Sequence, residues 1–179
     1  MVKFLTLNSE YNHNWNAVTL ALWKKYPNPF AAHVLAVDVI DRHIDENGII
    51  HTTRLFLKKG KMPAWGAKLL NISEAYILET STVDPKRKEM TVKTKNLSHK
   101  KILLVEECQT IRPTLNNNTD ISTEVRIISN TSFFSLRSRI EGWGLNRFKQ
   151  GALNSSKGLA HVLEQLKLEF KQEFNPVHA

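Results

Sequence analysis

The feature that most constrains the fold is a change of hydrophobic period near residue 132. Upstream of it, apolar and polar residues alternate in short runs separated by turn signals, which is typical of β-strands. Downstream, apolar residues recur at every third or fourth position as far as residue 174, which is typical of a long amphipathic helix. The clearest helical spacing is that of Leu159, Val162, Leu163, Leu166 and Phe170. We therefore expect a set of strands packed against one long helix.

Two further elements are predicted before the main group of strands. Residues 2–8 alternate loosely and resemble a first strand. A helix is expected to start at Asn12 or Asn14 and to run to about Tyr26, because the prolines of the "YPNP" sequence that follows cannot continue a helix. Six strand-like runs then cover residues 33–42, 49–59, 75–83, 90–97, 101–112 and 123–129.

This order of elements predicts an α+β fold. A curved antiparallel sheet of about seven strands is expected to cover the long C-terminal helix, which could bend near Gly151 or Gly158. Such an arrangement can leave a hollow between sheet and helix that accepts an apolar ligand. We expect one domain over residues 1–174, followed by a short tail over residues 175–179.

The charge balance favours an anionic partner. The chain has 25 Lys and Arg against 17 Asp and Glu, a formal net charge of +8. Nucleic acid, an anionic membrane surface or an acidic small molecule would each fit this balance. Few aromatic residues stand in the strands, which is unlike a sheet that binds nucleic acid. A protein that is simply soluble and basic would fit the charge balance equally well, so the balance alone does not choose among these alternatives.

Several classes of chemistry find no support in the sequence. Cys108 is the single cysteine, so an internal disulfide and a cysteine-based zinc site are excluded, and we expect its thiol to be buried and inert. The seven histidines lack the spacing of a helical metal pair. Nucleotide-binding and nucleophile motifs are also lacking. We expect a protein that is not an enzyme and that has no metal and no cofactor.

Targeting and membrane segments are not predicted either. No apolar run approaches the roughly 20 residues of a membrane-spanning helix. The N-terminal sequence "MVKFLTLNSEYNHNW" resembles a strand and not a cleaved leader. If the protein resides in an organelle, we expect something other than a leader to retain it there.

The segment of residues 61–73 interrupts the strand pattern and has two interpretations. It is long and apolar for a connection between neighbouring strands, and it also carries two lysines. It could be a loop packed over the edge of the core. Alternatively, it could be an Ω-shaped lid whose apolar face seeks a membrane and whose lysines contact anionic headgroups. The residues concerned are Lys61, Met62, Trp65, Lys68, Leu69 and Leu70.

The alternation of side chains along the predicted strand of residues 49–59 shows which of them share a face of the sheet. Arg54 and Lys58 share parity with Phe56, so the three side chains point to the same face of the sheet. If that face is concave, two cations lie in a mostly apolar groove and call for an anionic partner such as a phosphate. If the face is convex, both are ordinary solvated surface residues. Parity alone does not choose between these alternatives.

Four further stretches stand out in the sequence: "KKYPNPFAAHVLAVDVIDR", "TTRLFLKKGKMPAW", "STVDP" and "EGWGLNRFK…SSKGL". Together they resemble the PRELI domain family, which includes the yeast Ups proteins and the animal PRELI and slowmo proteins. The match runs in order along nearly the whole chain, and the "YPNP" corner before the His-Val strand is its most specific part. "KMPAW" and "GLNRFK" are more similar to the PRELI branch than to the slowmo branch.

The resemblance implies a START-like fold and a carrier of phospholipid. A PRELI-like protein would shuttle phosphatidic acid between the mitochondrial outer and inner membranes and so support cardiolipin synthesis. The slowmo-like branch implies phosphatidylserine instead. The family further implies a heterodimer with a small twin Cys-x9-Cys protein of the intermembrane space, where the chain would lie peripherally on the inner membrane. A protein that docks on membranes without extracting lipid is the alternative from another class.

The resemblance also assigns residues to roles. The headgroup-binding residues would be Lys25, His33, Arg54, Lys58, Lys61, Arg147 and Asn154. The lid and its membrane contact would be formed by Met62, Trp65, Lys68, Leu69 and Leu70. Gly151 and Asn154 stand where relatives of the phosphatidic acid branch carry an Asn and a Lys, so one cation of the family site is missing here.

Overall fold

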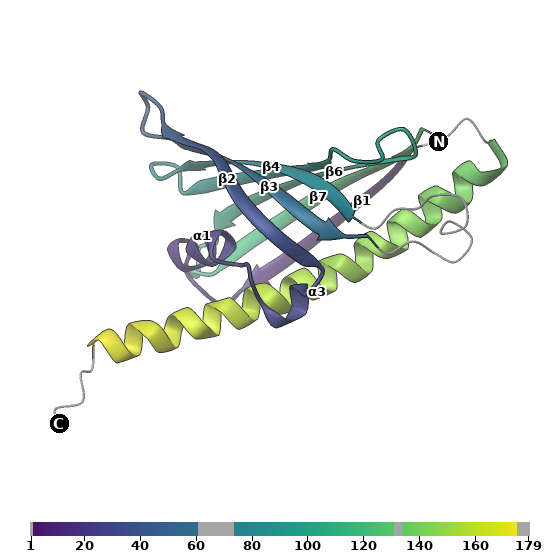
Figure 1. The fold of residues 1–179 in the computed structure, drawn as a ribbon. Coiled ribbons are helices and arrows are strands. Elements are labelled where there is room, and N and C mark those ends of the chain that lie inside the picture. Colours follow the sequence, from purple (N-terminus) through teal and green to yellow (C-terminus); the bar gives the residue numbers. More distant parts are fainter. Residues whose placement is uncertain (1, 61–73, 131–133, 175–179) are drawn as a thin grey trace.

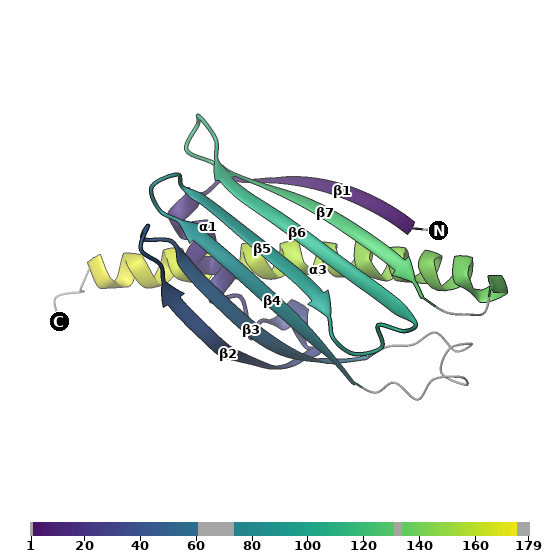
Figure 2. The same cartoon turned by 90° about the horizontal axis from the view of Figure 1, so that it is seen from above.

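The computed structural model describes residues 2–60, 74–130 and 134–174. In these residues a sheet of seven antiparallel strands, in the order β1-β7-β6-β5-β4-β3-β2, curves around one long helix. Figure 1 shows α3 along the concave side of the sheet, and Figure 2 shows it crossing the strands at an angle. The elements are β1 (Val2–Tyr11), α1 (Trp15–Trp23), a 3₁₀ turn η1 (Pro29–Ala31), β2 (Val34–Ile44), β3 (Ile50–Lys59), β4 (Glu74–Asp84), β5 (Glu89–Asn96), β6 (Leu103–Pro113), β7 (Thr119–Ser129) and α3 (Phe134–Phe174).

The predicted α+β fold is confirmed, and its element boundaries shift by a few residues. β7 begins at Thr119, earlier than predicted, because it pairs with β6 along its whole length. α1 ends at Trp23 and not near Tyr26, since a residue before proline is disfavoured in the helical conformation. α3 continues without a break through Gly151 and Gly158.

The first helix is fixed at its N-terminal end. Asn14, and not Asn12, is the N-cap, and its side-chain oxygen accepts a hydrogen bond from the Ala17 amide at 2.9 Å. The Trp15 indole donates to the Ile111 carbonyl of β6 at 3.2 Å. α1 is thereby held against the inner face of the sheet.

The main hydrophobic core lies toward one end of the space between sheet and helix, in a region that we call the apolar half. It lies between α1, the inner faces of β4 to β7 and the C-terminal part of α3. Its buried members are Trp15, Val18, Ala21, Leu22, Val83, Met90, Val92, Ile111, Ile121, Leu159, Val162, Leu163 and Leu166. The helical spacing predicted for residues 159–166 therefore points into the core, as expected of an amphipathic helix.

The middle of α3 is much less covered. The helix approaches the sheet closely at Gly144, where an added Cβ would lie 3.0 Å from Leu103 and 3.3 Å from Ile127. Buried residues occur again between Gly158 and Leu166. Residues 145–157, all of which the structure describes, include no buried residue. The inner sheet residues Ile77 and Val105 are likewise only half-buried. This part of the interior stays partly accessible to solvent, and the predicted hollow would lie here.

The expected burial of Cys108 is wrong, whereas the expectation of an inert thiol stays a prediction. This residue is half-buried, because the strand register pairs it with Lys93 and Glu124 on the outer face of the sheet. No helix among the described elements, the 41-residue α3 included, is apolar enough along its length to cross a bilayer.

Candidate functional site

The strand register places a line of polar residues across the inner face of the sheet. Arg54 of β3 lies opposite Glu79 of β4, Glu79 opposite Thr94 of β5, and Thr94 opposite Glu107 of β6. Residues paired across antiparallel strands share a face, so all four side chains point toward the interior. The line runs through a sheet whose other inner positions are mostly aliphatic.

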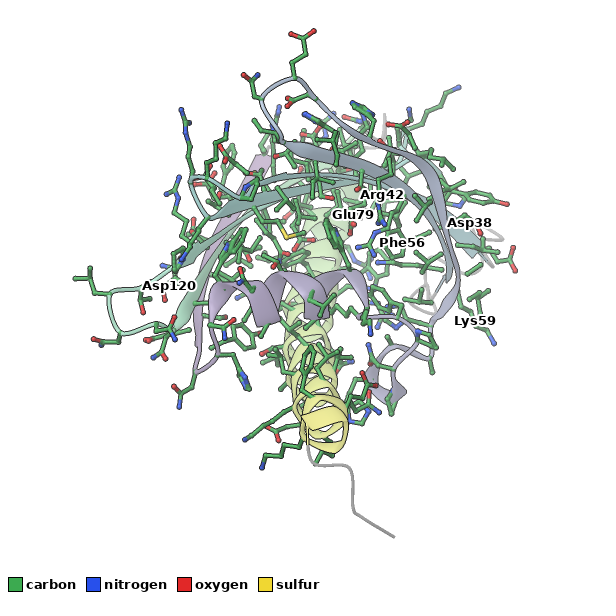
Figure 3. All side chains as sticks on the ribbon, turned by 90° about the vertical axis from the view of Figure 1, so that its left-hand side faces the viewer. Asp38, Arg42, Phe56, Lys59, Glu79 and Asp120 are labelled. Atoms are coloured by element: carbon green, nitrogen blue, oxygen red, sulfur yellow. The ribbon has the colours of Figure 1, made fainter. Side chains whose placement is uncertain are left out.

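The parity question for β3 is settled by this register. Phe56 is buried on the inner face, and Arg54 and Lys58 share its side. Figure 3 shows Phe56 and Glu79 inside the arch of the sheet, whereas Lys59 points outward. The interpretation of Arg54 and Lys58 as solvated convex residues is therefore wrong. Arg54 is only 5% exposed, and Lys58 is half-buried.

Arg54 is held by an internal ion pair. Its Nη2 lies 2.5 Å and its Nε 2.7 Å from Oε1 of Glu79, and its Nη1 donates to the Trp23 carbonyl at 3.1 Å. Glu79 is 8% exposed, so both members are removed from water. A carboxylate matched to a buried guanidinium compensates its charge and fixes its position. Arg54 therefore has a structural role in addition to contributing a positive charge.

Lys25 enters the interior from the corner between α1 and β2. Asn28 fixes this corner: its amide donates to the Lys25 carbonyl at 2.7 Å, and its side-chain oxygen accepts from the Phe30 amide at 2.9 Å. The Lys25 ammonium donates to Oγ of Ser155 on α3. Lys25 is 8% exposed, and burial lowers its pKa to about 8, although the nearby Glu107 opposes the change.

Two aromatic rings lie next to the cations of this region. The Tyr26 and Phe56 rings meet edge to face at 5.5 Å between centroids. The Lys58 ammonium lies 5.4 Å from the centre of the Phe56 ring. Burial lowers the pKa of Lys58 and raises the pKa of Tyr26 to about 12. Tyr26 therefore stays neutral at physiological pH.

Glu107 completes the group, which we call the buried charge cluster: Lys25, Arg54, Lys58, Glu79 and Glu107. Burial raises the pKa of Glu107, while Lys25, Lys58 and a 3.3 Å hydrogen bond donated by the Thr94 hydroxyl act in the opposite direction. The cluster so defined contains three basic and two acidic side chains. With all of them ionised, it carries an excess of positive charge inside the fold.

The other predicted headgroup residues take varied positions. His33 is half-buried beside the end of β3, and its carbonyl accepts from the Lys59 amide at 2.7 Å. Asn154 is half-buried on α3 next to Ser155, the partner of Lys25. Arg147 is exposed on α3. The headgroup role of each stays a prediction. Lys61 and the lid residues Met62, Trp65, Lys68, Leu69 and Leu70 lie outside the described residues.

Sequence reasoning missed the two acidic members of the cluster and the α3 contact. Glu79 shares parity with Ile77 and Val83, and Glu107 shares parity with Val105 and Ile111. A carboxylate among inward-facing aliphatic residues is a signal for a buried partner, and it was available in the sequence. Ser155 had no comparable signal, because its role depends on where the Lys25 corner meets α3.

Two further features of the described residues concern metal and ligand sites outside the buried charge cluster. Within residues 2–60, 74–130 and 134–174, no group of three His, Cys, Asp or Glu side chains is placed to hold a metal ion. A groove of about 470 Å³ lies between α1 and the C-terminal part of α3, with Ala17, Leu163 and Phe170 in its wall. None of the residues that line it belongs to the buried charge cluster.

Solved structures share the fold at low sequence identity. TTHA0849 from Thermus thermophilus aligns with a TM-score of 0.60 and 12% identity, over 92% of this chain and 99% of that one. The Zhui aromatase/cyclase from a Streptomyces species aligns with a TM-score of 0.59 and 8% identity, over 100% and 99% of the two chains. These neighbours have START/Bet v1-like folds, which confirms the predicted fold type.

Curated relatives are much closer in sequence. The chain is 36% identical over 167 residues to the protein ups1 homolog of Schizosaccharomyces pombe, covering 92% of this chain and 97% of that protein. It is 35% identical over 153 residues to UPS1, mitochondrial, of Saccharomyces cerevisiae, covering 84% and 87%. It is 33% identical over 174 residues to PRELI domain-containing protein 1, mitochondrial, of Homo sapiens, covering 94% and 78%.

The family profile described as PRELI-like matches residues 16–169, which include the whole buried charge cluster. None of the three relatives named above has the name of an enzyme, in agreement with the prediction of a non-enzymatic protein. The profile match and the identity to these relatives lead to the same assignment: this chain belongs to the PRELI-like family.

Proposed function

We propose that this protein is a phospholipid carrier that moves phosphatidic acid between the mitochondrial outer and inner membranes and so supports cardiolipin synthesis. The acyl chains would lie in the accessible interior, between the half-buried inner residues of β4 to β6 and residues 145–157 of α3. The phosphate would lie at the buried charge cluster. No bond is made or broken, so the carrier requires neither a nucleophile nor a general base.

The observation that carries this proposal is a pair of lysines facing the interior of the fold. Lys25 is nearly inaccessible and Lys58 is half-buried, although an ammonium removed from water is costly without an anionic partner. Arg54 is paired with Glu79, whereas Glu107 is the carboxylate that acts most strongly on Lys25 and Lys58. A lipid phosphate beside the two ammonium groups would supply the missing negative charge.

The family assignment supports the cellular setting. Two relatives are named as mitochondrial proteins. A heterodimer with a small twin Cys-x9-Cys protein would retain the chain in the intermembrane space, peripherally on the inner membrane. His33, Lys61, Arg147 and Asn154 would add to the headgroup contacts. The segment of residues 61–73 would be the lid that contacts the bilayer, with Trp65 foremost.

A liposome assay with matched variants tests the proposal. Fluorescent phosphatidic acid is moved from donor to acceptor vesicles by the full chain in complex with its partner protein. Lys58→Gln is compared with Lys59→Gln, since Lys59 is the exposed neighbour on the outer face. We expect Lys58→Gln to lose most of the transfer and Lys59→Gln to retain it. Equal transfer by the two variants would contradict the headgroup site.

The same assay separates the alternatives. A panel that compares phosphatidic acid with phosphatidylserine decides which headgroup is preferred. Native mass spectrometry of the purified complex decides whether lipid is extracted at all, because a carrier retains bound phospholipid and a docking protein does not. Vesicle binding without transfer or retained lipid would favour the membrane-docking alternative.

A further inference from the structure

Glu107 is the one carboxylate of the buried charge cluster that is not committed to Arg54. It lies half-buried on the inner face of β6, between Thr94 of β5 and Val125 of β7. The Thr94 hydroxyl holds its Oε2 at 3.3 Å, and it interacts electrostatically with Lys25 and Lys58. In the proposed headgroup site it therefore faces the same two ammonium groups that would bind the lipid phosphate.

We infer that Glu107 is a specificity-determining residue of this site: its carboxylate balances Lys25 and Lys58 while no lipid is bound, and it takes up a proton when a lipid phosphate enters. The inference rests on the proposed function. It adds that loading of an anionic lipid is coupled to proton uptake, and that the ionisation of Glu107 influences which headgroup is preferred.

The coupling follows from two anions sharing one pair of cations. A phosphate close to Lys25 and Lys58 is also close to Glu107, and like charges at a shared site favour protonation of one of them. Glu79 cannot relieve this conflict, because it is paired with Arg54 at 2.5 Å. Burial already raises the pKa of Glu107, so the phosphate acts in the same direction.

Headgroup preference follows from the same carboxylate. An ionised Glu107 attracts an ammonium group carried next to the phosphate, as in phosphatidylserine. A neutral side chain at this position removes that attraction and also the repulsion of the phosphate. The ratio of phosphatidic acid to phosphatidylserine retained should therefore rise when Glu107 is protonated or replaced by glutamine.

Other titratable groups surround the site and must be distinguished from Glu107. Charged and titratable residues of the surrounding elements are Lys25 and Tyr26 from the corner, Arg54 and Lys58 from β3, and Glu79 from β4. α3 contributes the buried Glu141, which lies one turn before Gly144. Gly144 packs against Leu103 of β6. Leu103 precedes Glu107 by four residues, or about 13 Å along the strand. His33 is a further imidazole in the region. A pH profile of the native protein alone would combine all of these contributions.

The test therefore compares the native complex with Glu107→Gln and Glu106→Gln. Glu106 is the adjacent residue on the outer face, where its carboxylate lies 3.5 Å from Arg126. Each protein is incubated with vesicles containing phosphatidic acid or phosphatidylserine between roughly pH 5.5 and 7.5, and the retained lipid is quantified by mass spectrometry. The lipid's own ionisation is common to all three proteins and cancels in the comparison.

We expect retention of phosphatidic acid by the native protein to rise as the pH falls. The rise should be roughly tenfold for each unit by which the bound phosphate raises the pKa of Glu107. Glu107→Gln should show higher retention at the upper end of the range, a weaker pH dependence and a higher ratio of phosphatidic acid to phosphatidylserine. Glu106→Gln should follow the native protein. A Glu107→Gln variant that matches the native protein at every pH would overturn the inference.

A second variant keeps the inference testable if Glu107→Gln folds poorly. Thr94→Val removes the hydroxyl that stabilises the Glu107 carboxylate and conserves its shape. It should move the retention curve to higher pH, and an unmoved curve would contradict the role of Glu107. Failure of the native protein to retain either lipid would instead refute the carrier function itself. The two failures are therefore distinguishable.

Discussion

The apolar half and the buried charge cluster both lie between the sheet and α3, but they differ in the polarity of their inner side chains and in the burial of the facing helix residues. In the apolar half, inner strand residues such as Met90 and Ile111 meet Leu159 and Leu163 of α3, and all four are buried. At the charge cluster, the inner strand residues are polar, and the opposing residues 145–157 of α3 include no buried residue among those described. The two regions therefore share the alternation that points side chains inward, and they differ in the polarity of those side chains and in the burial of the facing part of α3.

The largest effect that this comparison predicts is in the apolar half. Leu163 is 2% exposed and lies in the core between α1 and the sheet. Leu163→Ala should lower the free energy of unfolding by about 4 kcal/mol, because it removes buried methyl groups and leaves a cavity. Leu168→Ala is the matched control on the same helix, since Leu168 is 59% exposed. Urea denaturation measures both, and similar losses would contradict the proposed extent of the core.

A slightly smaller loss is expected within the charge cluster. Arg54→Met should cost about 3 kcal/mol, because it leaves the Glu79 carboxylate buried without its cation. The double variant Arg54→Met, Glu79→Leu should recover most of this loss, since well-packed apolar residues can replace a buried ion pair. A double variant as unstable as the single one would show that the pair has a further structural role, and a double-mutant cycle in urea measures this.

The fold was predictable because it depends on periodicity. The spacing of Leu159, Leu163 and Leu166 identified the buried stripe of α3, and period-two runs identified all seven strands. The boundaries were less predictable, since they depend on pairing partners. The run of residues 123–129 gave no sign that β7 extends back to Thr119, where β6 supplies hydrogen-bonding partners.

The site was only half predictable from the sequence. Parity placed Arg54 and Lys58 on one face of β3, but only the curvature of the whole sheet determines that this face is concave. Glu79 and Glu107 lie on strands distant in sequence from β3, and the register of β4, β5 and β6 brings them into line. Those contacts are long-range and are not encoded by any local pattern.

A third prediction is a gain in stability. Burial lowers the pKa of Lys25 from its ordinary value of 10.5 to about 8, so its charged form is less favourable in the folded than in the unfolded protein. Lys25→Met should therefore raise the free energy of unfolding at neutral pH by about 2 kcal/mol, after allowance for the lost Ser155 contact. The same substitution should abolish lipid transfer, since Lys25 is a cation of the proposed headgroup site.

The pH dependence of this gain follows from the direction of the shift. Between about pH 8 and pH 10.5 the unfolded chain holds the Lys25 proton more tightly than the folded protein, so the native protein becomes more stable as the pH rises. The advantage of Lys25→Met should be full below pH 8 and should disappear by about pH 10.5. Thermal unfolding at several pH values tests this, and a constant advantage would assign the gain to packing and not to charge.

The smallest effects distinguish two glycines of α3, one beside the accessible interior and one at the corner. An added Cβ at Gly151 meets no atom within 4 Å, whereas at Gly158 it would lie 2.8 Å from Nδ2 and Oδ1 of Asn28. Gly151→Ala should raise the free energy of unfolding by about 0.5–1 kcal/mol through helix propensity alone. Gly158→Ala should lower it by about 1 kcal/mol, because Asn28 must give up the hydrogen bonds that cap η1.

Asn28 also connects this last pair of substitutions to the site. Its amide donates to the Lys25 carbonyl at 2.7 Å, so displacing Asn28 also disturbs the placement of the Lys25 ammonium. We therefore expect Gly158→Ala to reduce phosphatidic acid transfer more than Gly151→Ala does, although both add one methyl group to the same helix, because only the former displaces Asn28. Urea denaturation and the liposome assay on the two variants provide the measurement. Equal stability and equal transfer would mean that the corner tolerates movement and that Lys25 is not positioned by it.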